Sequence, residues 1–396
     1  MMDKHAQPLL NQLGAYPFER LKKLFQHSSP NPELLHIDAG AGEPRLPLPS
    51  FVQDTLNEHI QGFSKYPATR GNADLQRAIA RWLKHRFHLQ QLDMGTQVLT
   101  ANGTREALFA IAHTLVNPEA KQKPYVMMPN PMYQIYYGAA VTAGAEPYLL
   151  HCLADDGFEP YLDNIDAKTW ERTAFMYVCS PSNPTGWIAK HDYYARLLEL
   201  ADRYDFYIVA DECYSEIYTD EPPIGLLEVA QQLGRNDFSR CLVMNSLSKR
   251  SALPGLRSGL IAGDATLIAR FAKLRSYTGP ATPLPLQAVA AKAWSDEQHV
   301  AKHLDVYRNS LHAFFDVWSE AHQPEGSFFV WLAVDDDEAF AKAAYEQQAV
   351  TVLPGSYLGA NDAQGCNAGA AYIRAALVDG ADKAAELAVR LKKVRV

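Results

Sequence analysis

Short apolar runs alternate with longer stretches in which apolar residues recur every three or four positions. A short β-prone run is typical of a buried strand, and the longer spacing is typical of a helix with one apolar face. Such helices are predicted after Gly103 and across residues 194–204. Buried strands are predicted at residues 98–100, 125–128, 174–178, 206–210, 242–244 and 260–262. This alternation predicts an α/β fold, with a mostly parallel sheet covered by helices on both faces.

The alternation holds from about residue 51 to residue 285, which we predict to be one large domain. Residues 286–396 differ, because a long helical segment is followed by strand-like runs and a closing helix. The helical segments are residues 296–318 and 383–393, and the strand-like runs are residues 328–332, 350–353 and 372–377. We therefore predict a smaller α+β domain, joined by an N-terminal segment of residues 1–50.

Length and composition fit this two-domain prediction. The chain has 396 residues, of which 47% are hydrophobic and 21% are charged, as is usual for globular proteins. Lys and Arg total 37 and Asp and Glu total 45, which gives a formal net charge of −8. Such mild acidity supplies no broad cationic surface, so nucleic acid is not an expected partner.

The cysteines and the N-terminal residues indicate a cellular compartment. The 5 cysteines are scattered and form no CxxC pair, so we expect buried thiols in a reducing environment and no metal site. The first residues lack the apolar core and cleavage site of a signal peptide, and no apolar run reaches the length of about 18 residues that a membrane span needs. We expect a cytoplasmic protein without a membrane partner.

A lysine lies among small hydroxyl residues directly after one predicted strand. Ser246, Ser248 and Lys249 follow the run at residues 242–244, and Arg257 comes eight positions after the lysine. A lysine amine can attack an aldehyde, while hydroxyl groups and a guanidinium can hold a phosphate. A lysine at a strand end, taken alone, is more often simply solvated.

An aspartate ends another predicted strand. Asp211 follows the apolar residues 207–210, so its carboxylate is expected at the carboxyl end of a central strand, where sites of open α/β sheets collect. A buried carboxylate there needs a cation. The alternative is a helix N-cap after the strand.

Two further segments place a polar or charged residue next to predicted strands: a turn that follows one strand and an arginine within another. Residues 180–186 follow a strand and have turn-forming composition, and the Asn183–Pro184 bond is a candidate cis peptide. Arg374 lies in an otherwise apolar strand, where an unpaired charge would cost several kcal/mol, on the order of the penalty for a stranded ion. Its anionic partner is either a ligand or an internal Asp or Glu.

Together these motifs resemble those of the fold type I, class I/II aminotransferases, which use pyridoxal 5'-phosphate, and the likeness covers nearly the whole chain. The resemblance implies that Lys249 forms a Schiff base with the cofactor and shuttles protons. It implies that Asp211 pairs with the protonated ring nitrogen. It gives Tyr214 and Asn183 hydrogen bonds to the ring oxygen.

The resemblance also implies a phosphate seat at the start of the helix after residue 102. Backbone amides at such a helix N-terminus can face an anion, although a glycine there often only makes a turn. The implied phosphate contacts are Gly103, Thr104, Arg105, Ser246, Ser248 and Arg257. Tyr133 occupies the position whose ring stacks on the cofactor. Tyr66 matches a tyrosine that reaches the phosphate of the neighbouring subunit, which implies a homodimer with shared sites.

For substrate, the resemblance pairs Arg374 with the α-carboxylate, assisted by Asn183 and the backbone of Gly42. Several stretches look most like the branch that transaminates N-succinyl-diaminopimelate with 2-oxoglutarate in bacterial lysine biosynthesis. These stretches are residues 16–21, 102–109, 133–136, 211–218 and 246–251. Residues 39–42 and 327–331 depart from the usual pattern near the expected substrate edge.

Several alternatives stay open at this point. Arg20, Arg250 and Arg275 are candidates for the distal carboxylate, and each could equally be a surface or packing residue. The nearest rival activity is another aminotransferase of aspartate or aromatic type, followed by a carbon–sulfur lyase or decarboxylase. A transcription regulator with an aminotransferase-like domain is disfavoured, because no basic winged-helix segment precedes the pattern.

Overall fold

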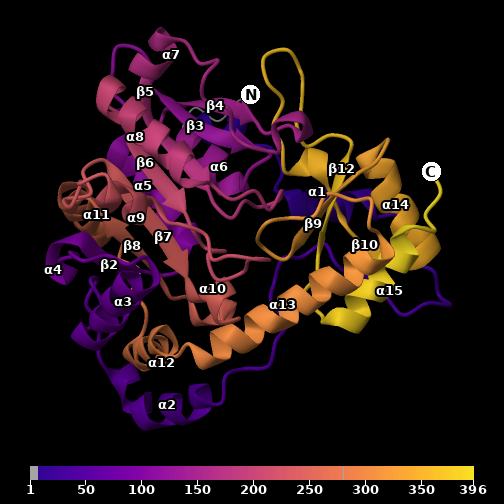
Figure 1. Ribbon diagram of the computed structural model, residues 1–396, viewed down its shortest axis with the longest axis horizontal. Helices are drawn as coiled ribbons and strands as arrows, with labels where there is room; N and C mark the ends of the chain where they lie inside the picture. Colours follow the sequence, from indigo (N-terminus) through magenta and orange to yellow (C-terminus); the bar gives the residue numbers. More distant parts are fainter. Residues whose placement is uncertain (1–7, 280) are drawn as a thin grey trace.

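A computed structural model describes residues 8–279 and 281–396, and its largest element is a seven-stranded sheet (Figure 1). The strand order is β2-β8-β7-β6-β5-β3-β4. Only β8 runs against the others, so the predicted mostly parallel sheet is confirmed. The strands are β2 (Val98–Ala101), β3 (Tyr125–Asn130), β4 (Glu146–His151), β5 (Thr173–Cys179), β6 (Tyr207–Asp211), β7 (Cys241–Ser246) and β8 (Gly259–Gly263).

Helices cover both faces of this sheet, because successive residues of each buried strand point to opposite sides. In β5, Phe175 and Tyr177 join one apolar cluster, and Met176 and Val178 join another. The first cluster includes α5 (Thr104–Leu115), α6 (Gln134–Thr142) and α11 (Ala265–Thr278). The second includes α3 (Ala73–Arg86), α8 (His191–Tyr204), α9 (Leu226–Gln232) and α12 (Leu284–Ser295). Strands that are apolar on both faces therefore lie in the middle layer of a three-layer fold.

The C-terminal elements form separate small sheets with their own core. β9 (Phe329–Ala333), β11 (Leu353–Pro354) and β12 (Tyr372–Ala376) make an antiparallel sheet, and β1 (Ile37–Asp38) pairs with β10 (Val350–Thr351). These strands pack with α13 (Gln298–Val317), α14 (Asp337–Gln348) and α15 (Ala381–Leu391). The β1–β10 pair holds the N-terminal segment against the C-terminal elements. The domain limits at residues 50 and 285 stay a prediction.

Several details differ from the expectations. The strand expected at residues 350–353 is two short strands in different sheets. β4 was not predicted, because Glu146, Pro147 and His151 interrupt its apolar pattern. Cys366 is exposed, whereas the other four cysteines are buried as expected. Within residues 8–279 and 281–396, the search for a helix apolar and long enough to span a membrane finds none.

Candidate active site

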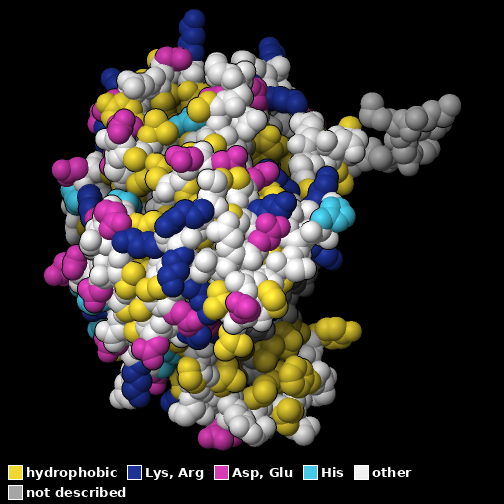
Figure 2. Space-filling view, turned by 90° about the vertical axis from the view of Figure 1, so that its right-hand side faces the viewer, with side chains coloured by type: hydrophobic (Ala, Val, Ile, Leu, Met, Phe, Trp, Pro, Cys, Tyr) yellow, Lys and Arg dark blue, Asp and Glu magenta, His cyan; other side chains and the backbone are white. Residues whose placement is uncertain are grey.

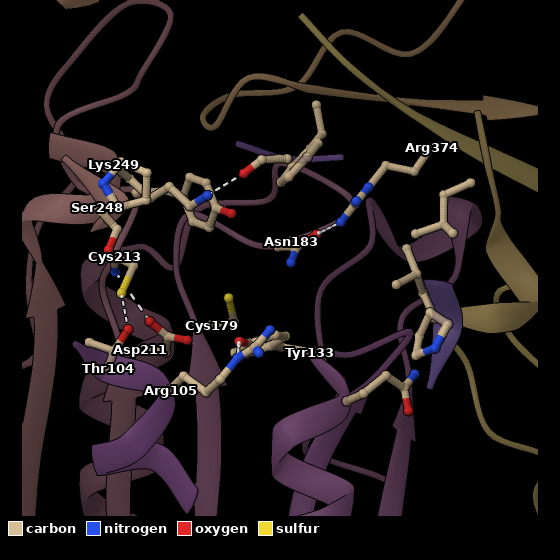
Figure 3. A pocket seen from close by; sticks show the side chains of 18 of the residues that line it. Thr104, Arg105, Tyr133, Cys179, Asn183, Asp211, Cys213, Ser248, Lys249 and Arg374 are labelled. Carbon is tan, nitrogen blue, oxygen red and sulfur yellow. Dashed lines mark hydrogen bonds between the residues drawn. The ribbon is translucent and has the colours of Figure 1, made fainter. Parts of the chain in front are cut away.

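A cavity of about 420 Å³ opens where the parallel strands end (Figure 3). Because β5, β6 and β7 are parallel and neighbouring, their carboxyl ends meet at one edge of the sheet. The segments that follow these strands carry most of the predicted site residues. Those that line the cavity are Gly42, Thr104, Arg105, Tyr133, Asn183, Asp211, Tyr214, Ser248, Lys249, Arg257 and Arg374. Gly103 and Ser246 lie directly beside lining residues, and Tyr66 lies outside.

Lys249 lies in α10 (Leu247–Arg250), the short helix after β7. Its ammonium group donates a hydrogen bond to the backbone carbonyl of Gly42 and lies 5.7 Å from the centre of the Tyr214 ring. The pKa of this amine is lowered from 10.5 to about 8, mainly because the amine is buried; Cys213 opposes the change and the nearby Arg374 guanidinium adds to it. About one tenth of this amine is therefore uncharged at pH 7, far more than for an ordinary lysine, and the uncharged form is the one that acts as a nucleophile or base.

Asp211 ends β6, and its side chain is only 5% exposed. Tyr136 donates a hydrogen bond to Oδ2 at 2.7 Å, and the backbone N–H of Cys213 donates to Oδ1 at 3.3 Å. Burial raises the pKa of the carboxyl group, while these hydrogen bonds and Lys249 oppose the change. Among residues 8–279 and 281–396, no Lys, Arg or His forms an ion pair with it. The carboxylate is thus positioned for a cation that a ligand brings.

The turn before α5 forms a compact polar seat. Gly103 has φ = +80°, and a side chain at this position would collide with the Arg257 guanidinium. That guanidinium donates to the backbone carbonyls of Asn102 at 2.9 Å and Pro254 at 2.7 Å. The N-terminus of α5 and Arg257 therefore point toward the same end of the cavity. The hydroxyl of Ser248 lines it and lies 2.9 Å from the hydroxyl of Ser246. An anion is the ligand that this set of donors fits.

Arg374 extends from β12 on the opposite side of the cavity and is 4% exposed (Figure 3). Its Nη1 donates to Asn183 Oδ1 at 2.8 Å, and its Nη2 donates to the carbonyl of Gly40 at 2.9 Å. Its Nε has no hydrogen-bond partner among residues 8–279 and 281–396, and its guanidinium lies 4.1 Å from the centre of the Phe329 ring. Burial lowers the pKa of Arg374 to about 10. No Asp or Glu within the described ranges pairs with it, so the internal ion-pair alternative is not observed.

The structure also shows the Asn183–Pro184 peptide bond, Tyr133 and Tyr66. The Asn183–Pro184 peptide bond is cis. Tyr133 lines the cavity, and burial raises the pKa of its hydroxyl to about 12. Tyr66 is fully exposed at the surface, away from the lining of its own chain's cavity.

The three arginines suggested for a distal carboxylate do not line the cavity. Arg250 pairs with Glu297, and Arg275 pairs with Glu106 at 3.1 Å. The side chains of both arginines are buried. Arg20 lies 3.7 Å from the centre of the Tyr357 ring and 3.6 Å from a carboxylate oxygen of Glu338. All three therefore have partners within the protein.

Sequence reasoning missed several lining or supporting side chains. Tyr16, Cys213 and Phe329 line the cavity, and Tyr136 supports Asp211 from behind. Tyr16 precedes α1 (Pro17–Leu24), in a stretch already noted for its likeness to the family. Tyr136 lies one helical turn after Tyr133, and this spacing is the signal that could have identified it.

The chain is similar to known proteins over most of its length. The family model described as "Aminotransferase class I and II" matches residues 36–383. The LL-diaminopimelate aminotransferase of Aquifex aeolicus is 27% identical over 371 residues, which cover 91% of this chain and 92% of that protein.

Two solved structures are similar over nearly the whole chain. An aminotransferase from Neisseria meningitidis is 38% identical, with a TM-score of 0.93 over 98% of this chain and 100% of that one. Aminotransferase AspB from Helicobacter pylori is 34% identical, with a TM-score of 0.89 over 96% of this chain and 98% of that one.

Proposed function

This chain belongs to the class I and II aminotransferases, which depend on pyridoxal 5'-phosphate, and from this premise we propose a specific reaction for it. The enzyme transfers an amino group from N-succinyl-LL-2,6-diaminopimelate to 2-oxoglutarate. The products are N-succinyl-2-amino-6-oxopimelate and glutamate, and the reaction belongs to the diaminopimelate pathway of bacterial lysine biosynthesis. Transamination itself rests above all on one observation: the Lys249 amine, with a pKa of about 8, shares a cavity with Asp211 and Arg374.

The residues of the cavity fit the cofactor. Asp211 is a buried carboxylate without an ion pair in the described ranges, which suits a protonated ring nitrogen. The seat formed by the N-terminus of α5 and Arg257 suits a phosphate. When bound, pyridoxal phosphate supplies an aldehyde for covalent attachment and a ring that withdraws electrons from the substrate's α-carbon.

We assign the chemical roles to residues around the ring. Lys249 Nζ would hold the cofactor's aldehyde carbon, and it would take and return the proton at the substrate's α-carbon. Asp211 keeps the ring nitrogen protonated. Tyr214 and Asn183, which line the cavity, would donate hydrogen bonds to the ring oxygen, and Tyr133 would hold the face of the ring. The phosphate contacts are the backbone amides of Gly103, Thr104 and Arg105 and the side chains of Ser246, Ser248 and Arg257.

We assign the substrate's α-carboxylate to Arg374. Its Nε lacks a hydrogen-bond partner in the described part of the chain, and its guanidinium faces the cavity between Asn183 and Phe329. A carboxylate placed there accepts two parallel hydrogen bonds and removes the cost of a buried, incompletely paired cation. Asn183 and the backbone of Gly42 complete this subsite.

We also propose a homodimer in which Tyr66 contributes to the neighbouring site. Tyr66 is exposed, and so are the apolar side chains of Leu48, Ile60 and Phe63 around it in sequence. Figure 2 shows apolar side chains gathered at the lower end of one face, the end at which Figure 1 places α2 (Phe51–His59). A large exposed apolar area of this kind is typical of a protein interface. We propose the cytoplasm as the compartment, in keeping with five cysteines that form no disulfide.

A second candidate donor is LL-diaminopimelate itself. The relatives from Aquifex aeolicus and Maridesulfovibrio salexigens, at 27% and 28% identity, are named LL-diaminopimelate aminotransferases. The two donors differ by the succinyl group on one nitrogen. LL-diaminopimelate carries two carboxylates, and the succinyl group adds a third to N-succinyl-diaminopimelate.

A panel of amino donors with 2-oxoglutarate tests the proposal. Purified, cofactor-loaded protein is assayed for glutamate formation with N-succinyl-diaminopimelate, LL-diaminopimelate, aspartate and phenylalanine. We expect the highest kcat/KM for N-succinyl-diaminopimelate. Strong turnover of aspartate or phenylalanine, with none of N-succinyl-diaminopimelate, overturns the choice of substrate.

Two controls accompany the panel. Lys249→Ala should abolish transamination and the fixation of cofactor by borohydride, with the fold retained by circular dichroism. Retained activity in that variant contradicts the role of Lys249. Release of ammonia or pyruvate without a keto-acid acceptor would instead indicate a lyase.

A further inference from the structure

A histidine, an aspartate and a cysteine gather at the carboxyl end of β4, outside the candidate active site. His151 is the last residue of β4, and Asp362 and Cys366 lie in the loop between Tyr357 and β12. Each residue offers one ligand atom, and the three atoms all lie within 4.8 Å of one another. Among residues 8–279 and 281–396, this is the one group of three or more His, Cys, Asp or Glu side chains close enough to share a metal ion.

The loop holds the carboxylate and the cysteine side by side. Asp362 Oδ1 accepts hydrogen bonds from the backbone N–H groups of Gln364 at 2.9 Å and Cys366 at 2.8 Å. The backbone N–H of Asp362 donates to the carbonyl of Cys366 at 2.9 Å, which closes the turn. These bonds engage Oδ1, while Oδ2 lies 3.2 Å from His151 Nε2. One carboxylate oxygen is therefore fixed by the loop, as is typical of the carboxylates in metal sites, and the other is directed at the histidine.

The strand next to β4 also contacts this loop. His151 is paired with Asn130 of β3 in the sheet. The side chain of Asn130 donates to the carbonyl of Ala360 at 3.0 Å and accepts from the N–H of Ala360 at 3.0 Å. The loop is thus joined to the end of the sheet beside His151, and the approach of the three ligands does not depend on the His151–Asp362 contact alone.

A histidine beside a carboxylate is by itself an ordinary surface pair. His191 lies 3.1 Å from Asp192, and His88 lies 2.9 Å from Glu228. Neither pair belongs to a group of three ligands within the described ranges. The thiol distinguishes the group at His151. Imidazole, carboxylate and thiolate are all ligands of zinc, whereas calcium and magnesium prefer oxygen ligands alone.

We propose that His151, Asp362 and Cys366 bind one Zn²⁺ ion per chain through Nε2, Oδ2 and the thiolate, with water as the fourth ligand. Tetrahedral zinc bonds of about 2.0–2.3 Å place ligand atoms roughly 3.3–3.6 Å apart, so the three side chains need only a small inward shift. The thiol proton passes to solvent as the ion binds.

This ion fastens the loop after Tyr357 to the end of β4, and it takes no part in transamination because none of its ligands lines the active-site cavity. The expectation of no metal site came from cysteines without a CxxC pair. The three ligands lie instead on segments far apart in the chain, which only the fold brings together.

Zinc titration of the cofactor-loaded protein, freed of metal by a chelator, tests the proposal. Calorimetry should show one zinc ion bound per chain. His151→Gln and Cys366→Ser should each weaken binding by at least about 100-fold, more than the loss of a supporting hydrogen bond usually costs. His191→Gln is the matched control, since it removes a histidine from a His–Asp pair without a thiol, and it should leave zinc affinity unchanged. A wild-type protein that binds no zinc, or an affinity that neither substitution of a ligand changes, overturns the proposal.

Two further measurements identify the thiolate. Co²⁺ in place of zinc should produce the ultraviolet absorption of a cobalt–thiolate bond in the wild type and in His191→Gln, but not in Cys366→Ser. Cys366 is exposed and the other four cysteines are buried, so zinc should slow the alkylation of Cys366 by iodoacetamide by at least about 10-fold, followed by mass spectrometry. Circular dichroism and the absorbance of the bound cofactor verify that each variant is folded. Bound cobalt without the thiolate absorption, or an alkylation rate that zinc does not change, contradicts the assignment.

Discussion

Replacing Lys249 by methionine should stabilise the cofactor-free protein at neutral pH while removing its activity. The lysine amine is enclosed at the wall of the cavity and donates to the carbonyl of Gly42. Burial, the largest influence on it, lowers its pKa from 10.5 to about 8, so the folded protein disfavours the charged form. Methionine has a similar length and carries no charge to bury.

The size of the effect follows from linkage. A pKa of about 8 in the folded state against 10.5 in the unfolded state corresponds to about 3 kcal/mol of lost stability below pH 8. Water in the cavity and the lost hydrogen bond to Gly42 reduce the gain, so we expect Lys249→Met to raise the free energy of unfolding by about 1–2 kcal/mol at pH 7. Between pH 8 and 10.5 the unfolded chain holds the proton that the folded protein has released. Wild-type stability therefore rises relative to the variant, and the advantage of Lys249→Met disappears.

Urea denaturation of the cofactor-free proteins, followed by circular dichroism from pH 6.5 to 10.5, measures this difference. Lys302→Met, at an exposed position of α13, is the matched control for a lysine-to-methionine change. A wild-type protein at least as stable as Lys249→Met at pH 7 would refute the reasoning. So would a stability difference that is the same at pH 7 and pH 10.

Three other outcomes are expected. Tyr136→Phe removes the 2.7 Å hydrogen bond to Asp211. This loss should alter the pH dependence of the bound cofactor's absorbance, measured by spectral titration, and lower kcat by about 10-fold, measured by steady-state kinetics. Arg374→Gln should raise the KM for every amino donor by about 10- to 100-fold, with a smaller change in kcat, since it removes the proposed partner of the α-carboxylate. Gly103→Ala should lower the free energy of unfolding by about 1–3 kcal/mol, measured by thermal or chemical denaturation, and weaken cofactor binding. The reason is that φ = +80° suits only glycine and that the new side chain collides with Arg257. Unchanged stability would contradict that geometry.

Local sequence patterns predicted six of the seven strands of the central sheet. The six predicted strands are apolar on both faces, and burial in a parallel sheet produces that pattern directly. β4 escaped because Pro147 and charged neighbours hide its periodicity. Val352 lies between two short strands of different sheets, a division that an apolar run cannot reveal.

The candidate site was predictable where strand ends and motifs coincide, as for Asp211, Asn183 and Lys249. Parallel strands bring those residues to one edge of the sheet whatever the other packing is. Side-chain direction was not predictable. That Arg250 and Arg275 turn toward glutamates while Arg105 turns into the cavity depends on contacts between segments far apart in the chain.

Residues from both the N-terminal and the C-terminal parts of the chain line the cavity, since Tyr16 and Gly42 line it together with Arg374. A ribosome-bound chain that has not yet released β12 therefore lacks Arg374, the residue proposed to bind the α-carboxylate, even when the seven-stranded sheet is already complete. If Arg374 has the proposed role, substrate binding requires β12 to have been synthesised, and two fragments divided between these segments could regain binding only by reassociating.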